Sequence, residues 1–201
     1  MLKSKLAAGA LAFSTLLIGA VPAYATPAAQ ATGTPRMPAT ALAVPGMLSE
    51  EESAALLFMR EEEKLAHDVY VTLYEQWGLR VFSNIAASEQ KHTDAVAALL
   101  DAYGLEDPTI GHGVGEFTNP ALQALYDDLV AQGSISAAEA LKVGVAIEEL
   151  DIADLEQRIA ETDNPDIQLL YSNLLAGSKN HLRAFSGGGV GRQGGGRGAR
   201  P

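Results

Sequence analysis

The chain contains no cysteine, and only 6% of its 201 residues are aromatic. The lack of cysteine excludes a disulfide framework, a thiolate zinc or iron–sulfur site and a cysteine nucleophile. Basic residues are also few, with 14 Lys and Arg against 25 Asp and Glu, so the formal net charge is -11. Because phosphate binding needs clustered Lys and Arg, nucleic acid is not expected as a partner. The 47% hydrophobic content is typical of a globular protein.

The first 25 residues have the three parts of a secretory signal peptide. Lys3 and Lys5 give a positive start, and Leu6 to Val21 form an apolar stretch. The small residues of Ala23-Tyr24-Ala25 make a cleavage site. The alternative is an N-terminal membrane anchor, for which the apolar stretch is short. We therefore predict an exported protein, periplasmic or extracellular, that keeps no stable membrane span after cleavage.

Two further segments have the composition of unstructured chain. Residues 26–47 are rich in Ala, Pro and Thr and contain no acidic residue, which predicts a flexible linker. Residues 186–201 are Gly-rich with three arginines as their only charges, which predicts a disordered tail. An Arg/Gly tail can contact RNA or anionic surfaces, although a solvated tail is the simpler interpretation. All 25 acidic residues lie in the remaining domain, residues 48–185.

Residues 48–185 show the three- and four-residue periodicity of amphipathic helices and no alternating strand pattern. Capping boxes at Ser49 and Ser136 begin two of the helices, and Pro120 and Pro165 suit the first turns of two others. The expected helices span about residues 49–77, 83–103, 120–131, 136–159 and 165–185.

The lengths of the connections constrain how these helices pack. The first two long helices are joined by a few residues, as are the last two, so each pair should be antiparallel. The connection between the second and third long helices is long enough to carry the chain back along a bundle. The sequence therefore predicts an all-α fold, a four-helix bundle with one long crossover that contains a short extra helix.

Acidic and imidazole side chains interrupt the apolar stripe of every long helix. These inward positions are Glu63 on the first helix, Glu89 and His92 on the second, Glu148 and Asp151 on the third, and His181 on the fourth. Glu62 is the alternative on the first helix, because residues 61–63 are all glutamate. Glu149 lies outside the narrow stripe to which Glu148 belongs.

Several carboxylates that point into one core need a cationic partner. Unpaired buried carboxylates are strongly disfavoured, and neighbouring ones repel each other. We find no Lys or Arg on the four stripes, so the sequence predicts a pair of divalent metal ions. Carboxylates with imidazoles are the ligand set of iron or manganese. Each residue taken alone also fits a solvated helix face or a satisfied core histidine, so the prediction depends on all four helices together.

At these residues the chain resembles the ferritin-like superfamily, and rubrerythrin in particular. The resemblance lies in Glu63 to Tyr70, in Ile85 to His92, which has the pattern Ala-x-x-Glu-x-x-His, and in Glu148 to Asp151. Over about residues 48–185 the chain is similar to a bacterial family known as domain of unknown function 2202. The segments that carry this similarity are FMREEEKLAHDVY, FSNIAASEQKH, FTNPALQALYDDL, EELDIADLE and NHLRAF.

The resemblance implies a ferritin-like bundle with a dinuclear iron or manganese site that reacts with O₂ or hydrogen peroxide. By position, Glu89 would bridge the metals, Glu148 would bridge or be terminal, and the terminal ligands would be Glu63, His92 and His181. The chain departs from the family pattern at Ser178, where the fourth-helix motif has a glutamate. Asp151 is the candidate substitute; otherwise one metal position is weak. The chain also lacks the Cys₄ rubredoxin module, so a peroxidase would need an outside electron donor.

Three hypotheses follow for the function. The first is a redox di-metal protein of catalase, peroxidase or oxidase type, in which an inward Tyr70 hydrogen-bonds the bound oxygen species. The second is a metal-binding or storage module without turnover, which the acidic surface and Ser178 favour. The third is a metal-free helical bundle that binds a partner. The sequence leaves both enzymatic turnover and the oligomeric state open.

Overall fold

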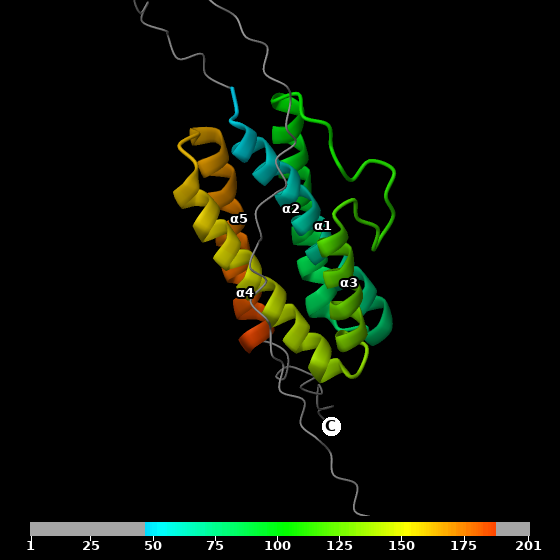
Figure 1. The fold of residues 1–201 in the computed structure, drawn as a ribbon. Coiled ribbons are helices and arrows are strands. Elements are labelled where there is room, and N and C mark those ends of the chain that lie inside the picture. Colours follow the sequence, from blue (N-terminus) through cyan, green and yellow to red (C-terminus); the bar gives the residue numbers. More distant parts are fainter. Residues whose placement is uncertain (1–46, 188–201) are drawn as a thin grey trace, which may run out of the picture. The chain divides into compact units, whose positions relative to one another are not determined.

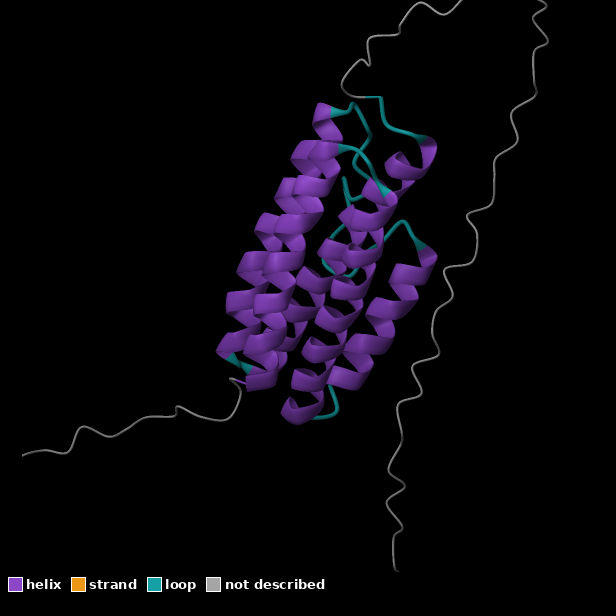
Figure 2. Ribbon diagram, turned by 90° about the vertical axis from the view of Figure 1, so that its left-hand side faces the viewer, coloured by secondary structure: helices purple, strands orange, loops and turns teal. Residues whose placement is uncertain are grey.

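The computed structural model describes residues 47–187, and every regular element in that range is an α-helix (Figures 1 and 2). The helices are α1 (Glu50–Trp77), α2 (Arg80–Ala102), α3 (Pro120–Gly133), α4 (Ala137–Glu161) and α5 (Pro165–Gly187). This confirms the predicted all-α class. None of these helices is both long and apolar enough to cross a membrane. The predicted signal peptide, and nearly all of the predicted linker and tail, lie outside the described residues.

The helix ends follow local signals in the sequence. Ser49 and Glu52 form the predicted capping box of α1, with both reciprocal hydrogen bonds at 3.0 Å. Gly78 ends α1 with φ 64°, a left-handed conformation that costs glycine little. At Ser136 only one of the two expected bonds is present, from the Glu139 N–H to the serine hydroxyl.

Two helix ends differ from the expected positions by a few residues. α2 begins at Arg80, three residues before the expected start at residue 83. α5 continues to Gly187, two residues into the segment expected to be tail. Neither end carries a strong stop signal: Leu79 caps α2 without a side-chain hydrogen bond, and a serine and a glycine close α5.

The four long helices pack lengthwise, and α3 covers one side of them (Figure 1). α1 lies against α2 and α4 against α5, each pair antiparallel because its connection is short. Contacts of α2 with α5 and of α1 with α4 join the two pairs. The long connection from α2 to α4 contains α3, which packs on both α1 and α4.

The connection between α2 and α3, residues 103–119, is held against α1 by buried polar side chains. Arg60 forms an ion pair with Asp107 at 2.9 Å. Glu61 and Asp68 are both buried and accept hydrogen bonds from backbone N–H groups of the connection. These bonds fix a segment that contains no helix of its own.

The core consists of two apolar clusters with a polar layer between them. On α1, for example, Leu56 and Met59 belong to one cluster and Leu65 to Leu73 to the other, while residues 61–63 lie between. On α2, α4 and α5 the polar residues likewise lie between the two clusters. The cluster that contains Leu65 to Leu73 is centred on Val69, Tyr70, Leu73, Phe82, Val143 and Phe185, and the other on Leu56, Met59, Val96, Leu100, Leu155 and Leu174. The intervening layer is where every predicted ligand lies.

Candidate metal centre

All six predicted ligands lie on the described helices, in the layer between the apolar clusters. α1 contributes Glu63, α2 contributes Glu89 and His92, α4 contributes Glu148 and Asp151, and α5 contributes His181. Five of them are buried, and the side chain of His92 is 13% exposed. Glu149 is exposed, which agrees with its expected place outside the stripe.

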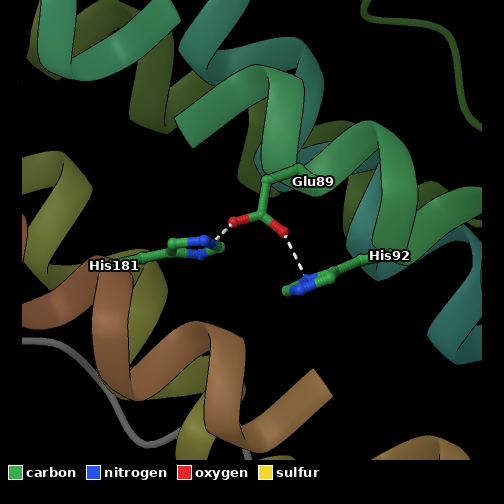
Figure 3. Close-up of side chains that lie close together, drawn as sticks. All are labelled: Glu89, His92 and His181. Atoms are coloured by element: carbon green, nitrogen blue, oxygen red, sulfur yellow. Dashed lines mark ion pairs between the residues drawn. The ribbon is translucent and has the colours of Figure 1, made fainter. Parts of the chain in front are cut away.

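Glu89 lies at the middle of the group, between the two imidazoles (Figure 3). Its Oε2 is 2.8 Å from Nδ1 of His92, and its Oε1 is 2.7 Å from Nδ1 of His181. Glu63 and Glu148 flank this pair: Glu63 Oε2 is 3.3 Å from His92 Nδ1, and Glu148 Oε2 is 3.6 Å from His181 Nδ1. Potential ligand atoms of Glu89, His92 and His181 all lie within 4.8 Å of one another.

Both imidazoles present Nδ1 to the carboxylates and turn Nε2 toward the protein. Nε2 of His181 is 2.9 Å from the hydroxyl of Ser88. Nε2 of His92 faces Gly177 so closely that a Cβ at that position would be 2.4 Å away. The two rings are 5.4 Å apart between centroids. The metal-binding nitrogen available to the centre is therefore Nδ1 in both residues.

Glu148 and Asp151 on α4 each accept a hydrogen bond from a hydroxyl. The Tyr70 hydroxyl donates to Glu148 Oε1 at 2.7 Å. The Ser178 hydroxyl donates to Asp151 Oδ2 and also contacts the Leu174 carbonyl. Tyr70 was expected to bond an oxygen species, but its single proton is directed at a carboxylate in this structure. Ser178, where the family motif has glutamate, instead orients the candidate substitute for that glutamate.

The buried acids of the layer differ in their pKa values. Burial raises the pKa of Glu63 to about 7, against a hydrogen bond from the neighbouring imidazole. Burial also raises the pKa of Glu148 and, well above its usual range, that of Asp151. For Glu89 burial acts in the same direction, but the two adjacent imidazoles, with Nδ1 atoms 2.8 and 2.7 Å from its oxygens, hold its pKa at about 2. Glu89 is thus the acid that stays ionised at neutral pH.

The pKa values of the two imidazoles are shifted by the same carboxylates. Burial lowers the pKa of His92, but hydrogen bonds to Glu63 and Glu89 outweigh it and raise the pKa to about 10. His181 behaves likewise, because Glu148 and Glu89 raise its pKa to about 9 against the effect of burial. Two imidazolium charges then face four buried acids, of which only Glu89 is held firmly in the ionised form, so without a further cation the others take up protons more readily than usual.

Several buried polar atoms of this layer have no hydrogen-bond partner. They are Glu62 Oε2, Glu63 Oε1, Asp151 Oδ1 and His181 Nδ1, the last of which is close to Glu89 without an aligned bond. Native proteins leave few such atoms unsatisfied, so each needs an explanation. Oxygen and imidazole nitrogen are the donors that iron and manganese accept, and bound cations could replace the protons that these buried acids otherwise take up. The residues present therefore fit the metal pair that the sequence predicts.

Glu62, the alternative on α1, is also buried but lies toward a different group. Burial raises its pKa well above the usual range, and the negative charge of Asp154 adds to this effect. Arg158 opposes it; that residue is 13% exposed, pairs with Asp154 and lies 4.9 Å over the ring of Phe58. The prediction that no Lys or Arg lies near the stripes was therefore incomplete. Glu63, not Glu62, contacts His92.

Three notable residues escaped the sequence analysis. Glu61 and Asp68 are buried on α1, although the expected inward stripe ran only through Glu63. Their partners belong to the α2–α3 connection, which has no periodicity from which to predict contacts. Gly177 carried a usable signal, because a glycine inside a helix costs stability unless a neighbour needs the space.

The comparisons with known proteins give a family match and a similar protein of known structure. The family model described as uncharacterized protein domain DUF2202 matches residues 52–197. The chain is 56% identical over 138 residues to the uncharacterized protein MJ0754 of Methanocaldococcus jannaschii, covering 69% of this chain and 75% of that protein. It is also similar to the crystal structure of hypothetical protein MJ0754 from Methanococcus jannaschii. That similarity has a TM-score of 0.68 at 51% identity, over 77% of this chain and 83% of the other. With most of its length matched by the family model, the chain belongs to the DUF2202 family.

Proposed function

We propose that residues 48–185 form a ferritin-like four-helix bundle that holds two iron or manganese ions and reacts with O₂ or hydrogen peroxide. The observation that carries this proposal is the polar layer itself. Four helices each contribute acids or imidazoles to one level, and among the described residues Glu63 and Asp151 there each have one carboxylate oxygen without a hydrogen-bond partner. Two divalent cations would replace the protons that these buried acids otherwise take up and would bind these free oxygens.

The ligand roles follow from position within the layer. Glu89, placed between the two imidazoles, suits a bridge between two metal ions, while Glu63 and Glu148 lie at the outer sides of the pair. Asp151 has one oxygen held by Ser178 and the other free, so it can supply the carboxylate that α5 lacks. When bound, the metal pair would supply the electron exchange with O₂ or peroxide.

The remaining residues of the layer hold the ligands and limit access by water. Tyr70 fixes one oxygen of Glu148 and leaves the other facing His181. The apolar clusters above and below the layer exclude water and strengthen the charge interactions within it. Conversion of two peroxide molecules to two waters and O₂ needs no outside electron donor. This reaction suits a chain without a cysteine-based electron relay.

We extend the proposal to the cellular location. Residues 1–25 have the features of a signal peptide, so the protein would act outside the cytoplasm, in the periplasm or beyond it. Small oxidants such as O₂ or peroxide would be its only substrates under this proposal. An oligomer is compatible with it but not required by it.

A storage or binding role without turnover is the second candidate, and Ser178 is the observation that favours it. With serine in place of the expected glutamate, α5 contributes one metal ligand, His181, to the layer. One of the two metal positions would then rest on Asp151 alone for its extra carboxylate. Such a position would bind more weakly and could release its ion instead of cycling it.

Metal analysis of the full chain after growth with added iron or manganese tests the proposal. We expect about two metal equivalents per chain, and evolution of O₂ when peroxide is added to the loaded protein. Glu148→Gln should lose bound metal and the reaction together. Glu149→Gln is the matched control, because the two glutamates are adjacent and only Glu148 is buried.

The outcomes separate the candidates. Full metal loading without O₂ evolution would support storage and reject turnover. Metal content below about 0.2 equivalents per chain, with no stabilisation on adding metal, would reject both metal functions, because a ligand that binds the folded state must stabilise it. A metal-free bundle that binds a partner would then be the remaining hypothesis.

A further inference from the structure

We propose that Ser88 and Gly177 are positioning residues of the centre, which hold His181 and His92 so that each imidazole offers only Nδ1 to the metals. The inference rests on the proposed function for its metal-binding consequence. Its structural content, the fixed orientation of two rings, can be tested in the metal-free protein. The two residues lie on the facing helices α2 and α5, and each fixes the imidazole of the opposite helix.

Ser88 acts on His181 through a hydrogen bond. The Ser88 hydroxyl on α2 lies 2.9 Å from Nε2 of His181 on α5, and the Nδ1 of the same ring is 2.7 Å from Glu89. An imidazole that binds a metal through one nitrogen carries its proton on the other, and that N–H needs an acceptor. The Ser88 oxygen is the acceptor within reach. It thereby sets both the tautomer and the rotation of the ring.

Gly177 acts on His92 through the space that it leaves free. A Cβ at position 177 would lie 2.4 Å from Nε2 and 2.5 Å from Cε1 of His92, which is closer than non-bonded atoms approach. Glycine inside a helix is unfavourable relative to alanine, so its presence four residues before His181 calls for a local cause. The His92 ring, whose Nε2 and Cε1 atoms occupy the space that a Cβ would need, is that cause. With Nε2 against the backbone, only Nδ1 can reach Glu89 and Glu63.

The two contacts are complementary. On one side a hydroxyl of α2 receives the α5 imidazole, and on the other the bare backbone of α5 receives the α2 imidazole. Together they hold the rings 5.4 Å apart between centroids with Glu89 between them (Figure 3). The ligand geometry is therefore built into the helix pair before any metal arrives, which lowers the reorganisation needed for binding.

The test begins with the metal-free full chain and uses NMR of ¹⁵N-labelled imidazoles. We expect a protected Nε2–H signal from His181 that disappears in Ser88→Ala and returns in Ser88→Thr, which keeps the hydroxyl. In Gly177→Ala the ring signals of His92 should move, because the new methyl group occupies the space of its Nε2. Gly133→Ala is the control, since the atoms nearest to its Cβ would belong to Leu73, at 2.6 Å and away from the centre.

The second measurement is Mn²⁺ affinity, followed by the EPR signal of the free ion. Ser88→Ala and Gly177→Ala should each bind Mn²⁺ roughly 10- to 100-fold more weakly than the natural chain, the usual cost of losing the partner of a ligand histidine. Ser88→Thr and Gly133→Ala should stay within about threefold of it. Helix propensity alone would make the Gly177→Ala chain more stable. A thermal melt therefore shows whether weaker Mn²⁺ binding in this variant comes from the displaced His92 ring or from unfolding of the chain.

Two results would overturn the inference. One is an unchanged His181 signal in Ser88→Ala, and the other is an unchanged His92 signal in Gly177→Ala. If the ring signals change as expected but no chain binds Mn²⁺, iron or cobalt, the positioning is supported and the proposed metal function fails. The two conclusions are thus tested separately.

Discussion

Two sets of buried acids, both represented on α1, differ in the hydrogen bonds that they find. We call Glu61 and Asp68 the tethered acids, because hydrogen bonds tie them to the α2–α3 connection. We call Glu63 and Asp151, with one unpartnered oxygen each, the open acids. All four are at most 8% exposed, so burial alone does not distinguish them. The difference lies in how many donors each carboxylate finds.

The tethered acids are satisfied by the protein itself. Glu61 Oε1 accepts from two successive backbone N–H groups at 2.6 and 3.1 Å. Asp68 accepts from Lys64, from His67 at 2.9 Å and from the Gly115 N–H at 2.9 Å. Burial would raise the pKa of Asp68, but these bonds outweigh it and the pKa is lowered. The open acids lack such donors, so their pKa values rise. A buried acid indicates a missing cation only where donors are missing too.

Neutralising one acid from each set should give the largest contrast. Asp68→Asn leaves the Lys64 ammonium, on a side chain that is only 12% exposed, without its counterion, and we expect a loss of about 3 kcal/mol in the free energy of unfolding. Glu63→Gln in the metal-free protein removes a charge that burial already disfavours, so we expect a change within about 1 kcal/mol. Urea unfolding in the presence of a chelator measures both.

Equal losses in the two variants would contradict the comparison, because the open acids would then be as well satisfied as the tethered ones. Glu61→Gln provides a further check on the tethered set. An amide oxygen can still accept from the N–H groups of Thr118 and Asn119, so this variant should lose less than Asp68→Asn.

The pH dependence of the metal-free protein should show a smaller effect of the same origin. Glu63 has a pKa of 4.5 when unfolded and about 7 when folded, so the folded state binds more protons between these values. The contribution of Glu63 to the free energy of unfolding, up to about 3 kcal/mol, is therefore fully present below pH 4.5 and is lost as the pH rises through 7. Asp68 has the opposite sign, but its stabilising effect is lost only as the pH falls below its ordinary value of 3.8.

The change in stability with pH is measured from the unfolding free energies at pH 5 and pH 7.5, with chelator present. Glu63→Gln should flatten it, because the variant has no carboxyl group at that position. Added Mn²⁺ should also reduce it, since a bound cation replaces the protons. A metal-free natural chain that is more stable at pH 7.5 than at pH 5 would show that the open acids are not protonated on folding.

Sequence periodicity predicted the helices and the polar layer well, for a physical reason. Positions such as Glu89 and His92 belong to long helices, whose geometry fixes which side chains point inward. Glu148 and Glu149 were separated by periodicity alone, and the structure places the first inside and the second outside. The capping box at Ser49 likewise depends only on local sequence.

The contacts that periodicity did not predict arise between segments far apart in the chain. The partners of Glu61 and Asp68 come from a connection without regular structure, whose path is set by packing on α1. Arg158 and Asp154 pair within α4, but the position of this pair beside Glu62 depends on how α4 packs against α1. Ser178 stood out in the sequence only as a departure from the family motif, whereas in the structure it donates to Asp151 across 27 residues of sequence. Sequence periodicity predicts which residues of a helix face inward, but not which residues of other segments they contact.

Ser178 provides the finest test of the comparison, because it is the only donor that the structure gives to Asp151. Ser178→Ala leaves both oxygens of Asp151 without a donor and should cost about 1 kcal/mol in the metal-free protein, the usual value of one buried hydrogen bond. Ser172→Ala, at an exposed serine on the same helix, is the control and should change stability by less than about 0.5 kcal/mol. Bound Mn²⁺ should reduce the difference between the two variants, because a cation satisfies the carboxylate that the hydroxyl no longer reaches. If Ser178→Ala instead matched the control without metal, Asp151 would be satisfied by other groups and would belong with the tethered acids.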